Sequence, residues 1–370
     1  MIHDAANSSD TSDIARLRLI RSDNIGPVTY RQLVRRFGTP QAALDALPDL
    51  VRRGGGAARI ATVADAEAEL AAVAKFGGRF VFIGTDLYPW LLAQTETAPP
   101  AIAVKGDIGL LERPAVAMVG ARNSSAAAVR FARELATELS RADLVVVSGL
   151  ARGIDSAAHQ GALDGGTIGV IAGGLDNVYP PENAALQAAI GASGLVVAEQ
   201  PLGTSRQARH FPRRNRIIAG LCAGTIVVEG ALKSGSLITA RIAAEAGREV
   251  MAVPGSPLDP RAQGCNQLIR EGATLVQTAA DVLEALGTVG GQIGGRLLSP
   301  GTAWDPGPVA LDADDTTRGY IIALLSPTPV AIDELVRQSG CAAATVASVL
   351  LDLELCGGLV RHAGGRVARV

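Results

Sequence analysis

Short apolar runs alternate with helical segments through the middle of the chain, from about Arg79 to Leu286. Six of these runs are almost uniformly apolar: AVAMVG, DLVVVSG, TIGVIAGG, GLVVAEQ, GTIVVEG and REVMAVPG. Strands of this composition are typical of a parallel sheet that helices cover on both faces. Between the first two runs, one helix face carries Ala128, Phe131, Leu135 and Leu139. The alternation predicts a doubly wound, extended Rossmann-like α/β domain, with the segment FVFIGTDLYPWLL…PPAIAVKGD adding strands at its edge.

A helical region precedes this domain and extends to about Gly78. The helical i, i+3, i+4, i+7 spacing is followed by Tyr30, Leu33, Val34 and Phe37. The turn-forming pair Gly26-Pro27 comes directly before them. This pattern predicts a helix-hairpin-helix whose turn offers N–H groups to a DNA phosphate and whose helix has a basic face of Arg31, Arg35 and Arg36. A plain helical packing module is the alternative.

The C-terminal part of the chain has a different pattern. The segment GTVGGQIGGRLLSPGTAWDPGPVALDADD is rich in Gly and Pro without a period, and it predicts a flexible linker. One short helix then carries Ile332, Leu335 and Val336, a second carries Val346, Val349, Leu350 and Leu353, and LVRHAGGRVARV forms two short strands. This order is typical of a winged helix. The expected domains are therefore 1–78 (helix-hairpin-helix-like), 79–286 (Rossmann-like), 287–315 (linker) and 316–370 (winged helix).

Composition limits the kinds of ligand and the cellular location that we expect for this protein. The formal net charge is −2, so a polyanion site must be a local cluster rather than a field of the whole molecule. No Cys or His group has the spacing of a zinc site, so no metal is expected. We expect the scattered Cys222, Cys265, Cys341 and Cys356 to be small buried side chains in a reducing compartment. The N-terminus lacks an apolar signal region, and no apolar stretch is long enough to span a membrane, which predicts a cytoplasmic protein without membrane contact.

Polar, Gly-rich loops follow three of the predicted strands, where ligands bind in an open α/β sheet. In the first loop, Gly120 to Ser125, Arg122 supplies a fixed charge and Ser124 or Ser125 can cap the next helix. Helix N-termini of this kind bind anions. Neither G-x-G-x-x-G nor G-x-x-x-x-G-K-[ST] is present, so a dinucleotide or ATP site of the usual kind is not supported and no cofactor is expected.

The second loop, SGLARGIDSAAH, places Asp155 and His159 four residues apart on one side of a helix. They could form a catalytic pair. The structural alternative is that Asp155 caps the helix and His159 is a buried, hydrogen-bonded histidine. In either case Ser148, Gly149 and Arg152 are better placed to meet a phosphate.

The third loop, KSGSLITA, begins with Lys233 and forms a small anion nest at a helix start, although Glu229 could pair with Lys233 and partly neutralise it. Upstream of it, five arginines occur without an acidic residue: Arg206, Arg209, Arg213, Arg214 and Arg216. Arginine suits phosphate oxygens. Phe211 is the only aromatic residue in this run, so base stacking is expected to be minor. Together the loops and the arginines favour a chain of phosphates over a single nucleotide.

Several motifs of the central domain closely resemble those of the DprA/Smf DNA-processing proteins. They are VAMVGARNSS, SGLARGIDSAAHQGAL, GLDNVYPPEN, FPRRNRIIAGL, SGSLITARIAAEAGREVMAVPG and GCNQLIREGA, in this order. The resemblance implies a non-catalytic homodimer that binds single-stranded DNA, protects incoming DNA in natural transformation and loads the recombinase RecA onto it. Single-strand-binding protein is a possible further partner. Carried over by position, it assigns the DNA pocket to Arg122, Asn123, Ser148, Gly149, Arg152, Arg213, Arg214, Asn215, Arg216, Lys233, Ser234 and Gly235.

Three alternatives remain open from the residues. The presumed recognition helix of the winged helix, CAAATVASVLLDLELCG, has no Lys or Arg, and only the wing carries Arg361, Arg366 and Arg369. A protein-contact or dimer-support role therefore competes with duplex binding. A nucleotide-processing enzyme of the LOG-like phosphoribohydrolase type is a second alternative, although the stretch P-G-G-x-G-T-x-x-E is absent. A winged-helix transcription regulator is the third, and the uncharged helix argues against it.

Overall fold

The structure is a computed structural model of the 370-residue chain, and it describes residues 2–55, 57–290, 313–362 and 364–370. Most of the predicted linker at 287–315 lies outside the described residues. The chain divides into two compact units. Unit 1 combines Met1–Ala68 with Trp304–Val370, and unit 2 is Glu69–Ala303. No described helix is both long and apolar enough to cross a membrane.

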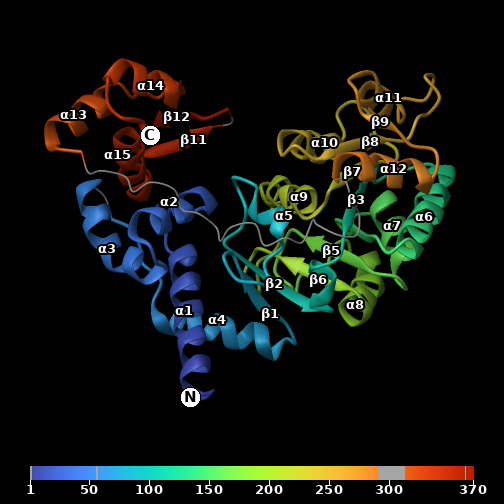
Figure 1. Ribbon diagram of the computed structural model, residues 1–370, viewed down its shortest axis with the longest axis horizontal. Helices are drawn as coiled ribbons and strands as arrows, with labels where there is room; N and C mark the ends of the chain where they lie inside the picture. The colour runs from blue at the N-terminus through green and yellow to red at the C-terminus, as the bar shows by residue number, and fades with distance from the viewer. Residues whose placement is uncertain (1, 56, 291–312, 363) are drawn as a thin grey trace. The chain divides into compact units, whose positions relative to one another are not determined.

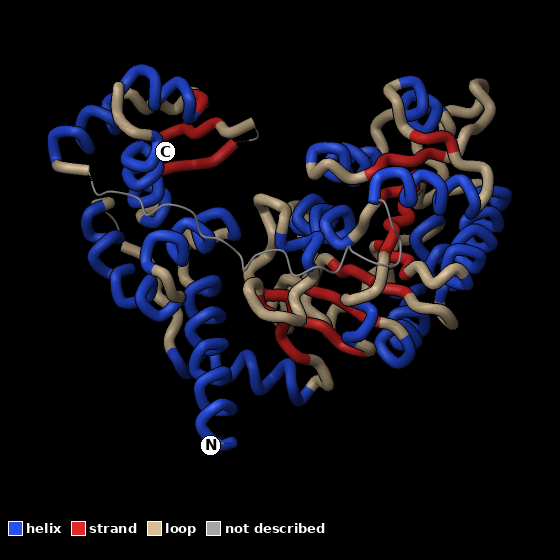
Figure 2. The backbone as a smooth tube through the Cα atoms, in the orientation of Figure 1, coloured by secondary structure: helices blue, strands red, loops and turns tan. Residues whose placement is uncertain are grey.

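Unit 2 is built on a nine-stranded sheet in the order β1-β2-β6-β5-β4-β3-β7-β8-β9 (Figures 1 and 2). The strands are β1 (Arg79–Phe82), β2 (Ala101–Gly106), β3 (Ala115–Val119), β4 (Val145–Ser148), β5 (Thr167–Ile171), β6 (Leu195–Ala198), β7 (Gly224–Val227), β8 (Glu249–Ala252) and β9 (Thr274–Leu275). The strands from β6 to β9 in this order are parallel, and β2 and β1 are added antiparallel at one edge. The six predicted strands, the doubly wound α/β architecture and the added edge strands are confirmed.

Helices cover both faces of this sheet. The central strands are therefore buried along their whole length. The helices are α4 (Val63–Lys75), α5 (Trp90–Ala93), α6 (Ala126–Arg141), α7 (Ile154–Ala162), α8 (Ala184–Ser193), α9 (His210–Leu221), α10 (Gly235–Glu245), α11 (Gln263–Arg270) and α12 (Ala279–Gly290). Short 3-10 turns follow β2 (Ile108–Leu111) and β5 (Pro181–Asn183). The predicted face of α6 packs into the main core, where Leu135 and Leu139 meet Met118 of β3 and Ile226 of β7.

The chain order of the strands reverses between β3 and β7. From β3 the chain proceeds through β4, β5 and β6 in one direction, and β7 and β8 then extend the sheet from the other side of β3. A crevice for ligands is expected outside the carboxyl ends of the strands at such a reversal. All three predicted anion-binding loops follow β3, β4 and β7, so they lie at this edge.

Unit 1 contains the N-terminal helices and the winged helix. Its elements are α1 (Ile2–Arg21), α2 (Pro27–Phe37), α3 (Pro40–Arg53), α13 (Asp315–Ala323), β10 (Val330–Ala331), α14 (Ile332–Ser339), α15 (Ala343–Leu355), β11 (Leu359–His362) and β12 (Arg366–Arg369). Gly26 is the N-cap of α2 and Pro27 its first residue, as the turn before the helix predicted. The two predicted helices and the hairpin of the winged helix are confirmed, while α13 and β10 were not predicted.

The four cysteines carry no disulfide. Cys222 and Cys265 are buried, as expected, whereas Cys341 and Cys356 are only partly buried. Burial raises the pKa of the Cys222 thiol well above its usual value. Neither buried thiol is therefore a nucleophile at neutral pH.

Candidate nucleic-acid interface

A pocket opens at the carboxyl ends of β3, β4 and β5. Arg122 reaches it from the loop after β3, Gly149 from the loop after β4, and Gly173 from the loop after β5. Helix α9 contributes Phe211 and Arg214. Residues from four separate segments thus meet at one point, and the two arginines place positive charge on two sides of it.

Two aromatic rings in this pocket each hold an arginine. The guanidinium carbon of Arg122 lies 5.1 Å from the ring centroid of Phe211, and that of Arg206 lies 3.4 Å from the ring of Tyr179. The two ring centroids are 6.3 Å apart and the rings meet edge to face. Each ring therefore has an arginine stacked over one of its faces, and rings combined with arginines are what proteins use to bind unpaired bases and their phosphates.

Tyr179 was not predicted as a site residue. It belongs to GLDNVYPPEN, which follows β5 in the chain but lies far in sequence from the arginine run. The position of this segment after a parallel strand was the available signal, because such loops gather at one edge. Phe211 is the only aromatic residue in the arginine run itself, and the fold brings a second ring, Tyr179, beside it.

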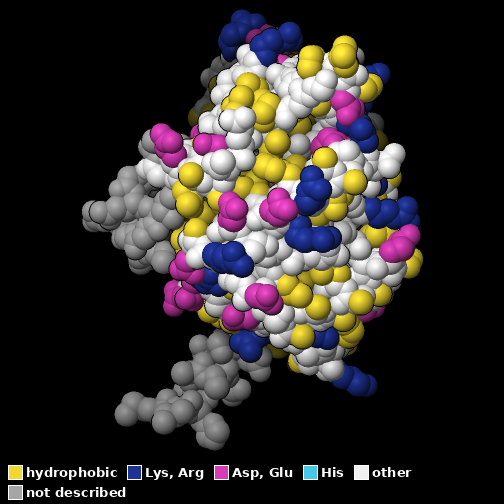
Figure 3. Space-filling view, turned by 90° about the vertical axis from the view of Figure 1, so that its right-hand side faces the viewer, with side chains coloured by type: hydrophobic (Ala, Val, Ile, Leu, Met, Phe, Trp, Pro, Cys, Tyr) yellow, Lys and Arg dark blue, Asp and Glu magenta, His cyan; other side chains and the backbone are white. Residues whose placement is uncertain are grey.

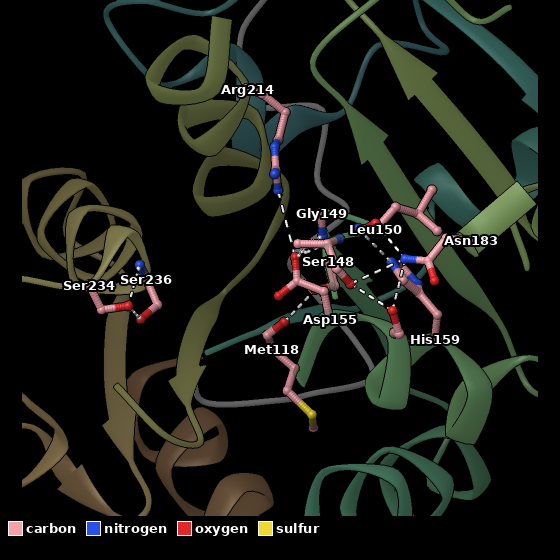
Figure 4. A network of polar contacts seen from close by, with 12 residues as sticks. Met118, Ser148, Gly149, Leu150, Asp155, His159, Asn183, Arg214, Ser234 and Ser236 are labelled. Carbon is pink, nitrogen blue, oxygen red and sulfur yellow. Dashed lines mark hydrogen bonds and ion pairs between the residues drawn. The ribbon is translucent and has the colours of Figure 1, made fainter. Parts of the chain in front are cut away.

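Arg214 is held in place by a buried carboxylate (Figure 4). Its Nη1 atom lies 3.9 Å from Oδ2 of Asp155, and both side chains are almost fully buried. The guanidinium packs directly on the backbone of Gly149, where a Cβ atom would come within 1.3 Å of Nη1. Only glycine leaves room for Arg214 at this place, so the prediction of Gly149 as a site residue acquires a steric reason.

Asp155 also organises the loop after β4. Its Oδ2 atom accepts hydrogen bonds from the backbone N–H groups of Gly149 at 3.1 Å and of Ala151 at 3.3 Å. Burial raises the pKa of this carboxyl, while Arg214 and the two amides act in the opposite direction. The interpretation of Asp155 as a helix cap is wrong, since Gly153 is the N-cap of α7 and Asp155 binds the amides that precede it.

His159 is a fully buried, hydrogen-bonded histidine, as the structural alternative predicted. Its Nδ1 atom lies 2.8 Å from Oγ1 of Thr167, and its Nε2 atom accepts a hydrogen bond from the N–H of Leu150 at 3.3 Å. Burial lowers the pKa of His159 to about 3, with Arg214 contributing in the same direction. Leu150 has a φ of +55°, so the histidine accepts from a residue held in a strained conformation.

Several predicted site residues are already engaged within the protein. Ser148 is completely buried and its hydroxyl donates to the carbonyl of Met118 at 2.6 Å, which contradicts its assignment as a side-chain contact to DNA (Figure 4). Arg216 pairs with Glu199 and also donates to a backbone carbonyl, so it binds the protein itself. Arg152 pairs with Glu182 at 2.5 Å, but both side chains remain more than half exposed. An exposed pair of this kind is weak and can be exchanged for a phosphate.

The remaining predicted residues lie at or near the surface. Arg213 is exposed at the start of α9, and Asn215 is partly buried beside it. Asn123 and Lys233 are exposed on the loops after β3 and β7. Ser234 is the N-cap of α10 and accepts from the N–H of Ser236, while Gly235 begins the helix. The structure does not place Lys233, Ser234 or Gly235 among the residues that line the pocket.

A carboxylate of the protein joins the loops that follow β3 and β7. Glu229, which follows β7, accepts hydrogen bonds from the N–H of Ser125 at 3.0 Å and from its hydroxyl at 2.7 Å. Ser125 in turn caps α6, as predicted, by accepting from the N–H of Ala128. Glu229 contacts Ser125 and lies 4.0 Å from Arg261, rather than pairing with Lys233. The N-terminus of α6 is thus bound to an internal anion.

Charge is mixed on the one face of the molecule that Figure 3 shows. On the face of the molecule drawn in Figure 3, Lys and Arg side chains are interspersed with Asp and Glu and form no continuous basic field. Among the described residues, no group of three or more His, Cys, Asp or Glu side chains is arranged to hold a metal ion.

Comparison with known proteins gives one consistent result. The family model described as "DNA recombination-mediator protein A" matches residues 79–287. A DprA-like N-terminal HHH domain matches residues 10–72, and a DprA winged helix domain matches residues 305–365. These matches agree with the predicted fold class, including the helix-hairpin-helix and the winged helix.

Individual relatives agree with the family models. The chain is 49% identical over 200 residues to the DNA processing protein DprA of Streptococcus pneumoniae, covering 54% of this chain and 71% of that one. It is 38% identical over 325 residues to a putative DNA processing protein DprA of Mycobacterium tuberculosis, covering 85% and 77%. The solved S. pneumoniae DprA structure matches with a TM-score of 0.58 at 41% identity, over 66% of this chain and 82% of that chain. A Helicobacter pylori DprA structure, titled for its single-stranded DNA binding mode, matches with a TM-score of 0.52 at 27% identity, over 57% and 96%. The chain therefore belongs to the DprA/Smf family of DNA-processing proteins.

Proposed function

We propose that this protein binds single-stranded DNA in the pocket formed by Arg122, Arg206, Arg214, Tyr179 and Phe211, and that it breaks no bond in doing so. Membership of the family places the protein in DNA processing and recombination. The DNA-binding mode named for the H. pylori relative supports a single strand as the ligand. Within this proposal the arginines hold phosphates and the two rings contact unpaired bases.

The observation that carries the proposal is the convergence of three arginines and two aromatic rings in one pocket. A duplex hides its base faces, whereas a single strand can present a base to a ring and its phosphate to the adjacent guanidinium. Arg214 is fixed from behind by Asp155, so it need not be immobilised when the strand binds. Arg152, Arg213 and Lys233 are further exposed cations that do not line the pocket.

The test is the salt dependence of binding to a fluorescent oligothymidylate. For a single strand, log affinity falls against log salt with a slope of about −0.7 per phosphate neutralised. We expect Arg122→Ala to weaken binding to all sequences alike and to make the slope shallower by about one phosphate. Phe211→Leu should weaken binding by about 1–3 kcal/mol with no change of slope, because a ring carries no charge.

The matched control is Arg130→Ala, which removes an exposed arginine of α6 that does not line the pocket. This variant should bind like the wild type. Equal losses in Arg122→Ala and Arg130→Ala would show that binding depends on total charge rather than on the pocket. Affinity that does not respond to salt in the wild type would contradict the proposal as a whole.

The geometry supports a binding role over nucleotide processing. A general base must reach the proton it removes, whereas His159 is fully buried with both ring nitrogens engaged. Glu229 occupies the helix N-terminus at the strand-order reversal, which is the usual place of a mononucleotide phosphate. Incubation with nucleoside monophosphates should therefore release no base, and turnover that Glu229→Gln abolishes would favour the enzyme.

The wider role that the resemblance implies is part of the proposal. It comprises protection of incoming DNA in natural transformation, loading of RecA onto that DNA and assembly of a homodimer. The division into residues 1–78, 79–286, 287–315 and 316–370 and the cytoplasmic location stay predictions from the sequence. A RecA strand-exchange assay on DNA coated with single-strand-binding protein tests the loading step, and Arg122→Ala should lose stimulation in it if DNA binding by the pocket is required.

A further inference from the structure

Helix α15, the third helix of the winged helix, is buried on two opposite faces. One face carries Val346, Val349, Leu350 and Leu353 and packs in the core of the winged helix. The other face carries Ser348, Leu351, Asp352 and Leu355, and these are buried as well. Their i, i+3, i+4, i+7 spacing places them along one line of the helix. In DNA-reading winged helices the corresponding outer face would be open to enter the major groove.

The outer face of α15 is covered by the N-terminal helices of the same unit. Arg36 of α2 and Asp352 approach to 3.6 Å, with 7% and 5% of their side chains exposed. Arg318 of α13 donates to Asp352 at 2.5 Å and also to the backbone carbonyl of Arg53, at the end of α3, at 2.9 Å. One buried carboxylate thus lies between two arginines, one from the N-terminal helices and one from the winged helix.

Close packing at the end of α3 supports the same contact. A Cβ atom on Gly54 would lie 2.6 Å from the carbonyl oxygen of Asp352 and 2.7 Å from Cβ of Cys356. The backbone of Gly54 has ordinary helical angles, so glycine is required here by the close approach and not by the turn. In addition, Asn24 donates its side-chain amide to the carbonyl of Leu355 at 3.0 Å.

We propose that the winged helix is a docking module that binds, through the outer face of α15, helices α2 and α3 of its own chain. The charges fit this partner and not DNA. Helix α15 carries Asp352 and Glu354 and no Lys or Arg, so it attracts the arginines of α2 and repels phosphate. Burying one member of such a charge group without its partners would be strongly unfavourable, which favours a specific partner.

The contact has a consequence for both motifs of unit 1. It occupies the outer face, from Ser348 to Leu355, of the helix that a duplex reader would insert into the groove. It also engages Asn24, which lies in the turn that a helix-hairpin-helix would offer to a phosphate. While docked, the outer face of α15 is covered, and the turn is held by this hydrogen bond of Asn24, which itself stays exposed. The arginine at position 36, predicted from the sequence as part of a basic DNA-binding face, is then a docking residue.

The test places a substitution on one side of the contact and a reporter on the other, in the full-length protein. Gly54→Ala inserts a methyl group where α15 approaches, and Arg36→Gln removes the N-terminal partner of Asp352. The reporter is Cys356, whose rate of alkylation is followed by mass spectrometry in native buffer. We expect the rate to rise several-fold in both variants, because the thiol becomes more accessible when α15 leaves α3. The control is Gly319→Ala in α13, where nothing lies within 4 Å of the added carbon, and its rate should match the wild type.

Two outcomes would overturn the proposal. The first is an alkylation rate of Cys356 that stays at the wild-type value in both Gly54→Ala and Arg36→Gln. The second is a slower rate when double-stranded DNA is added to the wild type, because this would show that a duplex covers the end of α15. The alkylation rate of Cys341, which packs against the winged-helix core, should stay at the wild-type value, because the winged helix remains folded when it leaves α2 and α3.

Discussion

Arg214 of α9 and Asp155 of α7 form a buried ion pair, in which Nη1 and Oδ2 are 3.9 Å apart and each side chain is 8% exposed. The pair connects the helix that carries the arginine run to the loop that follows β4. The same carboxylate binds the N–H groups of Gly149 and Ala151. The position of an arginine that lines the pocket and the conformation of a neighbouring loop therefore depend on one side chain.

Asp155→Asn should lower the free energy of unfolding by about 3–5 kcal/mol, because it leaves the guanidinium of Arg214 buried without its counter-charge. Urea denaturation at neutral pH measures this change. The matched control is Glu182→Gln, which breaks the exposed pair with Arg152 and should cost less than about 1 kcal/mol. Equal costs for the two substitutions would mean that Arg214 is solvated in the folded protein.

Gly149→Ala should reduce affinity for single-stranded DNA while the protein still folds. The added Cβ atom would lie 1.3 Å from Nη1 of Arg214, so the guanidinium must leave its place in the pocket. Fluorescence anisotropy with a labelled oligonucleotide measures the loss. Gly191→Ala in α8 is the control, since its Cβ atom meets nothing closer than 3.9 Å. If Gly149→Ala bound DNA with wild-type affinity, Arg214 would not contribute to DNA binding.

The free energy of unfolding should decrease as the pH is lowered, because His159 is buried in its neutral form. Burial lowers its pKa to about 3 in the folded chain, against 6.5 for the exposed side chain. A depressed pKa means that protonation favours the unfolded chain, so the stabilisation is complete above pH 6.5 and is lost as the pH falls toward 3. Between about pH 7.5 and pH 5 this residue should account for about 2 kcal/mol of lost unfolding free energy.

His159→Gln removes this titration and keeps a group that can accept from the N–H of Leu150. Its unfolding free energy should therefore depend less steeply on pH than that of the wild type. The pKa of His210 is also lowered, chiefly by burial, but this group is present in both proteins and its effect cancels in the comparison. Parallel pH profiles for the two proteins would indicate that His159 is accessible to protons.

Glu229→Ala should lower the free energy of unfolding by about 1–3 kcal/mol, since the N–H and hydroxyl groups of Ser125 lose their acceptor. Thermal denaturation followed by circular dichroism detects the change. Glu138→Ala removes an exposed carboxylate of α6 and should stay within about 0.5 kcal/mol of the wild type. A neutral result for Glu229→Ala would mean that water replaces the carboxylate without cost.

The sheet of unit 2 could be predicted because burial on both faces leaves a local signature. Each central strand is a short run of apolar residues, and this property needs no knowledge of the neighbouring strands. Strand β9, with two residues, is too short to produce such a run. The reversal of order at β3 could not be derived from the runs themselves, since it depends on pairing between distant segments.

The candidate site was predicted less completely, because ion pairs with distant carboxylates decide which arginines stay free to bind a ligand. Arg216 and Arg213 are three residues apart in the same run, yet one is bound to Glu199 and the other is exposed. No acidic residue lies near them in sequence, so this difference is tertiary. Ser148 ends a buried strand and its hydroxyl points toward Met118, which the composition of the loop does not reveal.

For α15 the sequence shows a property of the helix but not the surface that covers it. Its sequence shows that the helix lacks positive charge, which left a protein-contact or dimer-support role in competition with duplex binding. The identity of the covering surface required Arg36 and Gly54, which are separated from the helix by most of the chain.

The two margins of the large sheet differ from its interior in a way that bears on self-association. At one margin the outermost strand is β1, four residues long and antiparallel to β2, and at the other it is β9, with only two residues. Edge strands this short offer few unpaired backbone N–H and C=O groups with which a strand of another molecule could pair. Two copies of this protein should consequently meet through side chains on helices and loops, and the sheet should not extend from one molecule into the next.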